Sequence, residues 1–278
     1  MKDYAYYNGI FSPFEKTSIS LSDRSIYFGD GCYDVILLHN GTPYQFEEHF
    51  SRLLCNCNRL FLSLDLNQRQ LLSIIHRLSD LSSISSGVIY VQISRNGGKR
   101  KHEISVDSRS NVLITLTKYS LSDRSPLKAI TVEDKRHTLC DIKTLNLIYS
   151  VISIKQANDL GCDCAIYIRD NIVTEEARSS VLILVGDELI THPLDDCILP
   201  GIMRSNILRS ADYLRLKVKE EKFTYSDMLK SDEVFVCSTT KFISRISEID
   251  GIRVGLKNDG IFTDLYNHLL RDFTHKTV

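Results

Sequence analysis

The order of apolar and polar residues along this chain predicts a succession of short strands and helices. In residues 4–11, and again in residues 33–45, strand-like apolar runs are interrupted by the dipeptides Asn8-Gly9 and Asn40-Gly41. Asn and Gly both tolerate positive φ, so this dipeptide between apolar runs is a strong signal for a β-hairpin. The first 45 residues therefore predict two hairpins.

Helical periodicity begins after the second hairpin. Residues 47–61 and 67–81 place apolar side chains at every third or fourth position, which predicts two helices with one apolar face each. Two β-rich runs follow at residues 88–94 and 112–117. The Ser-rich segment of residues 119–126 ends in Ser-Pro and is typical of a linker.

The second half of the chain also mixes strands with helices. Its patterns predict helices over residues 145–160, 201–214 and 261–273, and strands over residues 164–168, 181–185 and 234–237. The elements follow no strict βαβ alternation and no internal repeat. The sequence therefore predicts a mixed α/β protein of two domains, a smaller one over residues 1–120 and a larger one over residues 121–278.

Composition narrows the class of protein. The net charge is −1 and the longest basic run, Lys99-Arg100-Lys101-His102, is short, so nothing indicates binding to nucleic acid or to an anionic membrane. No apolar stretch has the length of a signal peptide or a membrane span, which predicts a cytosolic protein. The eight cysteines form no Cys-x-x-Cys pair, and we expect reduced thiols and no bound metal.

Several residues have side chains suited to chemistry, although each also has an ordinary structural explanation. Lys143 lies at the start of a predicted helix, where a lysine is commonly solvated. Arg52 flanks the apolar face of an earlier helix, which a snorkelling side chain explains equally well. Glu175 and Glu176 follow a strand, where two adjacent acids usually form a solvated tip. The Ser-Thr-Thr segment of residues 238–240 suits a phosphate-binding turn or an ordinary turn.

Together these residues match one known pattern. The chain resembles the fold-type IV enzymes that use pyridoxal 5′-phosphate (PLP), and in particular the D-amino-acid aminotransferases. The resemblance extends over residues 7–251, and its central stretch around Lys143 is specific to this fold type. The matching stretches are DRSIYFGDGCYDV (residues 23–35), HFSRL (49–53), VQISRNGGKRKHEI (91–104), VEDKRHTLCDIKTLNLI (132–148), NIVTEE (171–176), LPGIMR (199–204) and CSTT (237–240).

The resemblance implies a role for each candidate in binding PLP. Lys143 would hold the cofactor through a Schiff base and move a proton between substrate and cofactor, which requires an amine that can be neutral near pH 7. Glu175 would face the pyridine nitrogen and keep it protonated. Arg52 would bind the phosphate, because a guanidinium is always charged and can grip two oxygens. The other phosphate contacts that the resemblance implies are Ile202, Met203, Ser238 and Thr239.

Three further residues match the trap for the substrate α-carboxylate in D-amino-acid aminotransferases: Tyr33, Arg100 and His102. On an extended segment, residues i and i+2 point to the same side, so Arg100 and His102 can converge on one carboxylate. A solvated loop would explain these two residues if they stood alone. The resemblance therefore implies transamination between a D-amino acid, such as D-alanine or D-glutamate, and a 2-oxo acid, such as pyruvate or 2-oxoglutarate.

Other activities use the same cofactor and the same lysine. A branched-chain L-amino-acid aminotransferase and an aminodeoxychorismate lyase are two alternatives, and the Arg-x-His spacing argues against both. Departures from the family pattern leave a third, a PLP-binding protein with little turnover. Glu176 stands where the family has Gly, Arg178 lies among usually small residues, Met203 replaces Thr, and Arg245 replaces a common Pro. The resemblance also implies a homodimer and a PLP site at the interface of the two domains.

Overall fold

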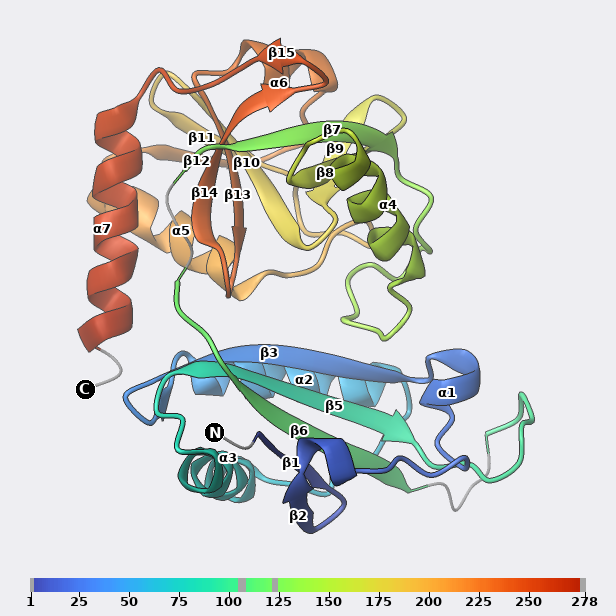
Figure 1. Cartoon of the computed structure of the whole chain (residues 1–278). Helices are drawn as coiled ribbons and strands as arrows, with labels where there is room; N and C mark the ends of the chain where they lie inside the picture. Colours follow the sequence, from blue (N-terminus) through green and yellow to red (C-terminus); the bar gives the residue numbers. More distant parts are fainter. Residues whose placement is uncertain (1–2, 105–108, 122–124, 276–278) are drawn as a thin grey trace. The chain divides into compact units, whose positions relative to one another are not determined.

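The chain folds into two compact units (Figure 1). The structure is a computed structural model that describes residues 3–104, 109–121 and 125–275. The first unit falls within Met1–Ser120, Ile142–Asn146 and Phe273–Val278, and the second within Leu121–Asp141 and Leu147–Asp272. Both units contain helices and strands, which confirms the expected mixed α/β class.

An antiparallel sheet in the order β2-β1-β6-β5-β3-β4 forms the base of the first unit. Both predicted hairpins are confirmed: the turns place Asn8 and Gly9 at φ values of 48° and 92°, and Asn40 and Gly41 at 49° and 80°. The strands are β1 (Tyr4–Tyr7), β2 (Ile10–Pro13), β3 (Gly31–His39), β4 (Thr42–Pro43), β5 (Gly87–Arg95) and β6 (Ser110–Lys118).

Two amphipathic helices bury their apolar faces in the core of this unit. Leu53 and Cys57 of α2 share one cluster with Leu71 and Ile75 of α3 and with the inner residues of the sheet. A capping box between Asn67 and the first turn of α3 explains where that helix begins. The helical elements of this unit are η1 (Phe14–Lys16), α1 (Ser25–Phe28), α2 (Phe46–Arg59) and α3 (Gln68–Ser82).

The second unit is organised around a closed ring of strands in the order β10-β13-β14-β7-β8-β9, because β9 pairs with β8 on one side and with β10 on the other. Strands β11 and β12 extend the sheet beyond β10, and β15 pairs with β14. The strands are β7 (Leu127–Glu133), β8 (Cys164–Arg169), β9 (Ile172–Glu176), β10 (Ser179–Val185), β11 (Glu188–Thr191), β12 (Lys217–Glu220), β13 (Glu233–Ser238), β14 (Phe242–Ile249) and β15 (Ile252–Arg253).

Helices pack on this ring, with α4 against β8, α5 against β13 and α6 against β9. Buried aliphatic side chains of the strands, such as Ile166, Ile183 and Val236, form a core of their own. Within the described residues, no helix combines the length and the apolar character needed to cross a bilayer. The helices are α4 (Ile148–Asp159), α5 (Ile202–Tyr213), α6 (Tyr225–Lys230) and α7 (Asp259–His275).

Candidate functional site

Lys143 lies on an extended segment that pairs with the start of β3. The Tyr33 N–H donates to the Lys143 carbonyl at 3.0 Å, and the Leu145 N–H donates to the Gly31 carbonyl at 3.1 Å. Helix α4 begins only at Ile148, so the expectation that Lys143 opens this helix was wrong. Because these backbone groups bond to β3, they are unavailable for a first helical turn, and the structure groups this segment with the first unit rather than with the second.

The Lys143 ammonium lies over an aromatic ring. Its Nζ is 4.4 Å from the centre of the Tyr33 ring, which in turn packs against the Tyr90 ring at 5.4 Å between centres. An amine against a ring face loses part of its hydration but keeps a favourable cation–π contact. Among the site residues expected from the sequence, the structure thus brings Lys143 and Tyr33 into contact.

Arg52 is held by a buried aspartate, so it is more than a snorkelling side chain. Its Nε and Nη2 donate to the two carboxylate oxygens of Asp34 at 2.9 and 2.7 Å. His49, one helical turn earlier on α2, contacts the same carboxylate through Nδ1 at 2.7 Å. Asp34 is 0% exposed. Burial would raise the pKa of Asp34, but the charge of Arg52 and the His49 contact hold that pKa below its usual range.

His49 is buried with one ring nitrogen unused. Its Nε2 has no hydrogen-bond partner among the described residues. Burial lowers the pKa of His49, Asp34 opposes that shift, and the nearby charges of Arg52 and Lys143 add to it. His49 therefore favours the neutral form, with its Nδ1–H donating to Asp34. This places His49 within electrostatic range of Lys143 on the same unit.

Arg100 and His102 gather around one aromatic side chain. The Arg100 guanidinium carbon is 5.0 Å from the centre of the Phe28 ring, and the His102 ring centre is 5.1 Å from it. Both side chains are exposed. These two residues thus lie near the same ring, on a bent loop rather than on the extended segment that the sequence led us to expect. The structure does not place Tyr33 in contact with either of them.

Arg24 anchors the loop that bears Arg100 and His102. It is 5% exposed, and its Nη groups donate to the main-chain carbonyls of Lys101 and His102. Its Nε donates to Asp30 at 2.7 Å, and its guanidinium also lies over the Phe28 ring at 4.6 Å. Arg24 was not singled out from the sequence, because nothing in its local pattern indicates a partner about 77 residues away.

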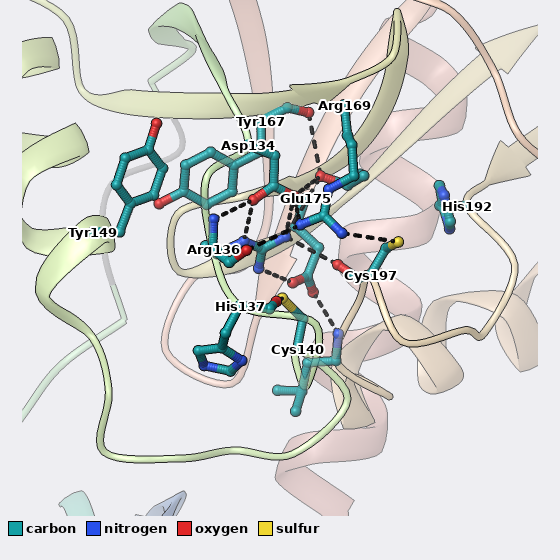
Figure 2. A network of polar contacts seen from close by, with 12 residues as sticks. Asp134, Arg136, His137, Cys140, Tyr149, Tyr167, Arg169, Glu175, His192 and Cys197 are labelled. Carbon is teal, nitrogen blue, oxygen red and sulfur yellow. Dashed lines mark hydrogen bonds and ion pairs between the residues drawn. The ribbon is translucent and has the colours of Figure 1, made fainter. Parts of the chain in front are cut away.

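Glu175 belongs to a network of buried polar groups in the second unit (Figure 2). Arg136 Nη1 donates to Glu175 Oε2 at 2.6 Å, and the Leu199 N–H donates to Oε1 at 3.1 Å. Glu175 and Glu176 are 6% and 1% exposed on β9, so they do not form the solvated tip that two adjacent acids usually form. Pairing of both residues with β10 across a tight turn explains their burial.

Arg136 is itself fixed by a second carboxylate. Its Nε and Nη2 donate to the two oxygens of Asp134, each at 2.9 Å, and its guanidinium lies 4.5 Å from the centre of the Tyr167 ring. Thr174 donates to Asp134 at 2.9 Å, and Arg169 lies 3.2 Å from the same carboxylate. Burial would raise the pKa of Asp134, but hydrogen bonds and the charge of Arg136 lower it overall. The guanidinium beside Glu175 is therefore held in one place.

The expected phosphate contacts lie at two places in the second unit. Ile202 and Met203 are the first residues of α5. The preceding residue, Gly201, has no side chain to cap the helix, so the first N–H groups of α5 have no hydrogen-bond acceptor within the helix. A Cβ at Gly201 would lie 2.9 Å from Ser180 Oγ, so the turn fits only a glycine closely. The second place is the turn after β13, where Ser238 and Thr239 are half-buried and Ser238 Oγ accepts from the Lys241 N–H at 3.3 Å.

These residues fit PLP in each unit considered by itself. In the first unit, an amine, a guanidinium and a buried ring nitrogen without a partner are available from Lys143, Arg52 and His49. In the second unit, the Glu175 carboxylate is an acceptor held in place by two donors, and the uncapped start of α5 suits an anion. Sequence reasoning missed five partners that lie in or beside the matching stretches: Asp34, His49, Arg24, Asp134 and Arg136.

Comparison with known proteins defines the class. The family model for class IV amino-transferases matches residues 31–249. A D-alanine aminotransferase from Bacillus licheniformis is 32% identical over 280 residues, which cover 98% of this chain and 99% of that protein. The chain belongs to the class IV aminotransferases, and these enzymes depend on PLP.

Solved structures agree on the fold. An Escherichia coli branched-chain amino acid aminotransferase matches with a TM-score of 0.90 and 18% identity, covering 100% of this chain and 97% of that chain. A branched-chain amino acid aminotransferase from T.th., complexed with N-(5′-phosphopyridoxyl)-L-glutamate, matches with a TM-score of 0.87 and 18% identity, covering 99% and 95%. These likenesses confirm the fold-type IV architecture that the sequence led us to expect.

Proposed function

We propose that the protein transfers the amino group between a D-amino acid, such as D-alanine or D-glutamate, and a 2-oxo acid, such as 2-oxoglutarate or pyruvate. The observation that carries this proposal is the pair formed by Arg100 and His102 on the Phe28 ring. A guanidinium and an imidazole near the same ring supply hydrogen-bond donors that suit a carboxylate. The name of the Bacillus licheniformis relative, at 32% identity over nearly the whole chain, supports the same substrate class.

When bound, PLP supplies an electron-withdrawing ring that allows the amino-acid Cα–H to be removed and that stores the amino group between half-reactions. Lys143 Nζ would bind the aldehyde carbon covalently and then move the proton at the substrate Cα. Glu175 would accept the N–H of the protonated pyridine nitrogen. Its pairing with Arg136 supports this role, since a carboxylate beside a fixed guanidinium remains an acceptor.

Arg52 in the first unit, and Ile202, Met203, Ser238 and Thr239 in the second, would bind the phosphate. The guanidinium of Arg52 carries its N–H donors in a rigid fork, and the contact with Asp34 orients that fork. The first N–H groups of α5 and the hydroxyls after β13 supply uncharged donors. Met203 gives only its main-chain N–H, so we expect one hydroxyl contact fewer than the family pattern supplies.

Tyr33, Arg100 and His102 would hold the substrate α-carboxylate. Lys143 would move the proton from one face of the bound cofactor, so the substrate Cα–H would have to point to that face. The amino nitrogen and the α-carboxylate of the substrate would also be fixed, so the substrate side chain would take the one remaining direction at Cα. The side on which the carboxylate is held would therefore decide whether a D- or an L-amino acid fits. Arg24 supports this role, because its hydrogen bonds to main-chain carbonyls hold the loop next to the Phe28 ring.

A panel of amino donors tests the proposal. The purified protein with PLP is assayed with D- and L-alanine, D- and L-glutamate and L-leucine against 2-oxoglutarate. We expect turnover of D-alanine to exceed that of every L-amino acid. Faster turnover of L-leucine or L-glutamate would assign the chain to the branched-chain activity of its structural neighbours, pyruvate release from aminodeoxychorismate would assign it to the lyases, and no turnover would leave a PLP-binding protein.

The role of Arg100 is tested in the same assay. Arg100→Ala would remove a charge-assisted contact to the substrate carboxylate. If that carboxylate is buried when bound, the loss costs about 2–5 kcal/mol, so kcat/KM for D-alanine should fall about 30-fold to several-thousand-fold. PLP affinity should change little. Lys99→Ala, next to it on the same exposed loop, is the matched control and should retain activity. An equal loss in both variants would argue against a specific carboxylate contact.

Attachment at Lys143 is tested chemically. Borohydride reduction of the PLP-loaded protein should fix the cofactor on the peptide that contains Lys143, and mass spectrometry reads the position. Lys143→Ala should bind PLP without fixation. Labelling of another lysine would contradict the assignment. The homodimer implied by the resemblance stays a prediction, which light scattering of the same preparation measures.

A further inference from the structure

Glu176, a residue that departs from the family pattern, forms a buried ion pair with Lys241. Lys241 Nζ lies 3.1 Å from Glu176 Oε2, and the side chains are 18% and 0% exposed. The same oxygen accepts the Arg178 N–H at 3.1 Å. Glu176 Oε1 has no hydrogen-bond partner in the described part of the chain, and Arg178 Nε is 3.8 Å away from it. Lys241 is therefore the cation that compensates this carboxylate at close range.

The pair connects two segments that are not neighbours in the sheet. Glu176 ends β9, directly after Glu175, whereas Lys241 follows Ser238, Thr239 and Thr240 in the turn after β13. Strand β10 lies between them: Ser180 pairs with Glu175 on one side and with Cys237 on the other. An ion pair that reaches across an intervening strand fixes the separation of its two outer segments.

We propose that Glu176 and Lys241 are positioning residues, which hold the acid that faces the pyridine nitrogen at a fixed distance from the turn that binds the phosphate. This inference rests on the proposed roles of Glu175, Ser238 and Thr239. Each member of the pair is covalently close to one of the two ends: Glu176 adjoins Glu175, and Lys241 is two residues from Thr239. The Glu that replaces the family's Gly thus acts together with its partner lysine.

The ion pair could act through the charge of Lys241 alone or by fixing the position of the turn, and these two explanations predict different effects of single variants. If Lys241 acted only by its charge, Glu176→Gln would release a cation beside the phosphate turn and strengthen phosphate binding. If the pair acts by position, Glu176→Gln and Lys241→Met both loosen the turn relative to β9, and both weaken PLP binding. Removing both partners avoids an uncompensated buried charge, which is the main penalty when one member of a buried pair is lost.

The test is a double-mutant cycle on PLP affinity, with the protein prepared without cofactor and titrated by absorbance. We expect Glu176→Gln and Lys241→Met each to weaken PLP binding on the order of tenfold, and the double variant to lose less than the product of the two. Lys241→Arg should restore most of the affinity. Arg178→Gln is the matched control, since its exposed side chain is close to the same carboxylate, and it should change affinity less than twofold.

A second measurement separates position from a general loss of structure. Pyridoxal without phosphate, and inorganic phosphate as a competitor, are titrated against each variant, and the absorption band of bound PLP reports the environment of the ring. Positioning predicts that the single variants lose affinity for PLP more than for either fragment, with a shifted band and a melting temperature within a few degrees of wild type. Equal losses for all three ligands, tighter phosphate binding by Glu176→Gln, or strictly multiplicative losses would overturn the inference. A wild-type protein that binds no PLP would overturn the proposed function instead.

Discussion

Each unit buries an arginine against an aspartate, but the arginine has a different relation to the proposed chemistry in each. In the first unit, Arg52 itself is the proposed phosphate contact, and Asp34 orients it from behind. In the second, Arg136 orients the functional group, Glu175, and Asp134 orients Arg136. In the first unit one carboxylate, Asp34, orients the positively charged Arg52. In the second unit the carboxylate of Glu175 is held by the positively charged Arg136, and Arg136 needs a further carboxylate, Asp134.

The difference follows from the ligand chemistry. A phosphate is an anion, so the group proposed to bind it should be positively charged. Asp34 contacts the Nε and Nη2 groups of Arg52. In the proposed function Glu175 accepts from a protonated ring nitrogen, and a charged carboxylate that is only 6% exposed needs a cation close to it. The Arg136 guanidinium provides that stabilisation and is held by hydrogen bonds to Asp134 and Cys197. The second network is therefore the larger and the more sensitive to loss of its centre.

The largest effect is expected when the centre of the second network is removed. Arg136→Met removes the cation that contacts Asp134 and Glu175. Asp134 stays buried, and Glu175 then lies next to an apolar side chain. The free energy of unfolding should fall by about 3 kcal/mol, the lower end for a broken buried pair, because Arg169 still contacts Asp134 at 3.2 Å. Urea unfolding measures the change. Lys135→Met removes a neighbouring ion pair whose side chains are 63% and 72% exposed, and it should have almost no effect.

A smaller loss is expected when the first network loses its carboxylate. Asp34→Asn keeps the shape and one acceptor oxygen but removes the charge that Arg52 and His49 share. Hydrogen bonds to a charged group contribute about 2 kcal/mol, so unfolding free energy should fall by about that amount. Urea unfolding without added PLP is the measurement, and Asp65→Asn, at an exposed position before α3, is the control. A loss larger than that of Arg136→Met would reverse the ranking of the two networks.

The same contrast explains how far the sequence could predict the molecule. The Asn-Gly hairpins and the helices with one apolar face were found because their signals are local. Strand β14 was not predicted, because the polar residues Arg245 and Glu248 interrupt its apolar pattern in the sequence. Buried Arg245 is explained by Glu233, which accepts from its Nε at 2.9 Å. Such a partner, twelve residues away on another strand, is visible only after folding.

For the site, the resemblance named the residues that we propose bind the cofactor, and it left out the residues that hold their side chains in place. The positions of Lys143, Arg52 and Glu175 follow from matching stretches, but their environments do not. The helix start expected at Lys143 failed because pairing with β3 overrides local helical pattern. The partners Asp34 and Arg136 form contacts across 18 and 39 residues. Contacts of this range depend on topology, which a single sequence does not specify.

The smallest expected effect is a change in the pH dependence of stability, and it concerns the buried histidine of the first network. The first contains His49, whose pKa burial lowers in the folded protein, whereas Arg136 in the second is held by the carboxylates of Asp134 and Glu175 (Figure 2). As pH falls below about 6.5, the unfolded chain binds a proton at the histidine and the folded protein does not. The contribution of His49 to stability is therefore complete above that pH and declines below it.

His49→Gln removes this titration while keeping a polar side chain beside Asp34. We expect wild-type protein to lose more stability between pH 8 and pH 5.5 than the variant does, by at most about 1.4 kcal/mol, because pH 5.5 lies about one unit below the ordinary histidine pKa. Burial also lowers the pKa values of His137 and His192, so part of the dependence will remain in the variant. Urea unfolding at the two pH values measures the difference, and His76→Gln, on the exposed side of α3, should leave it unchanged. An identical loss in wild type and His49→Gln would mean that His49 shares the charge of Asp34 in the folded state, and the first network would then hold two cations around one carboxylate.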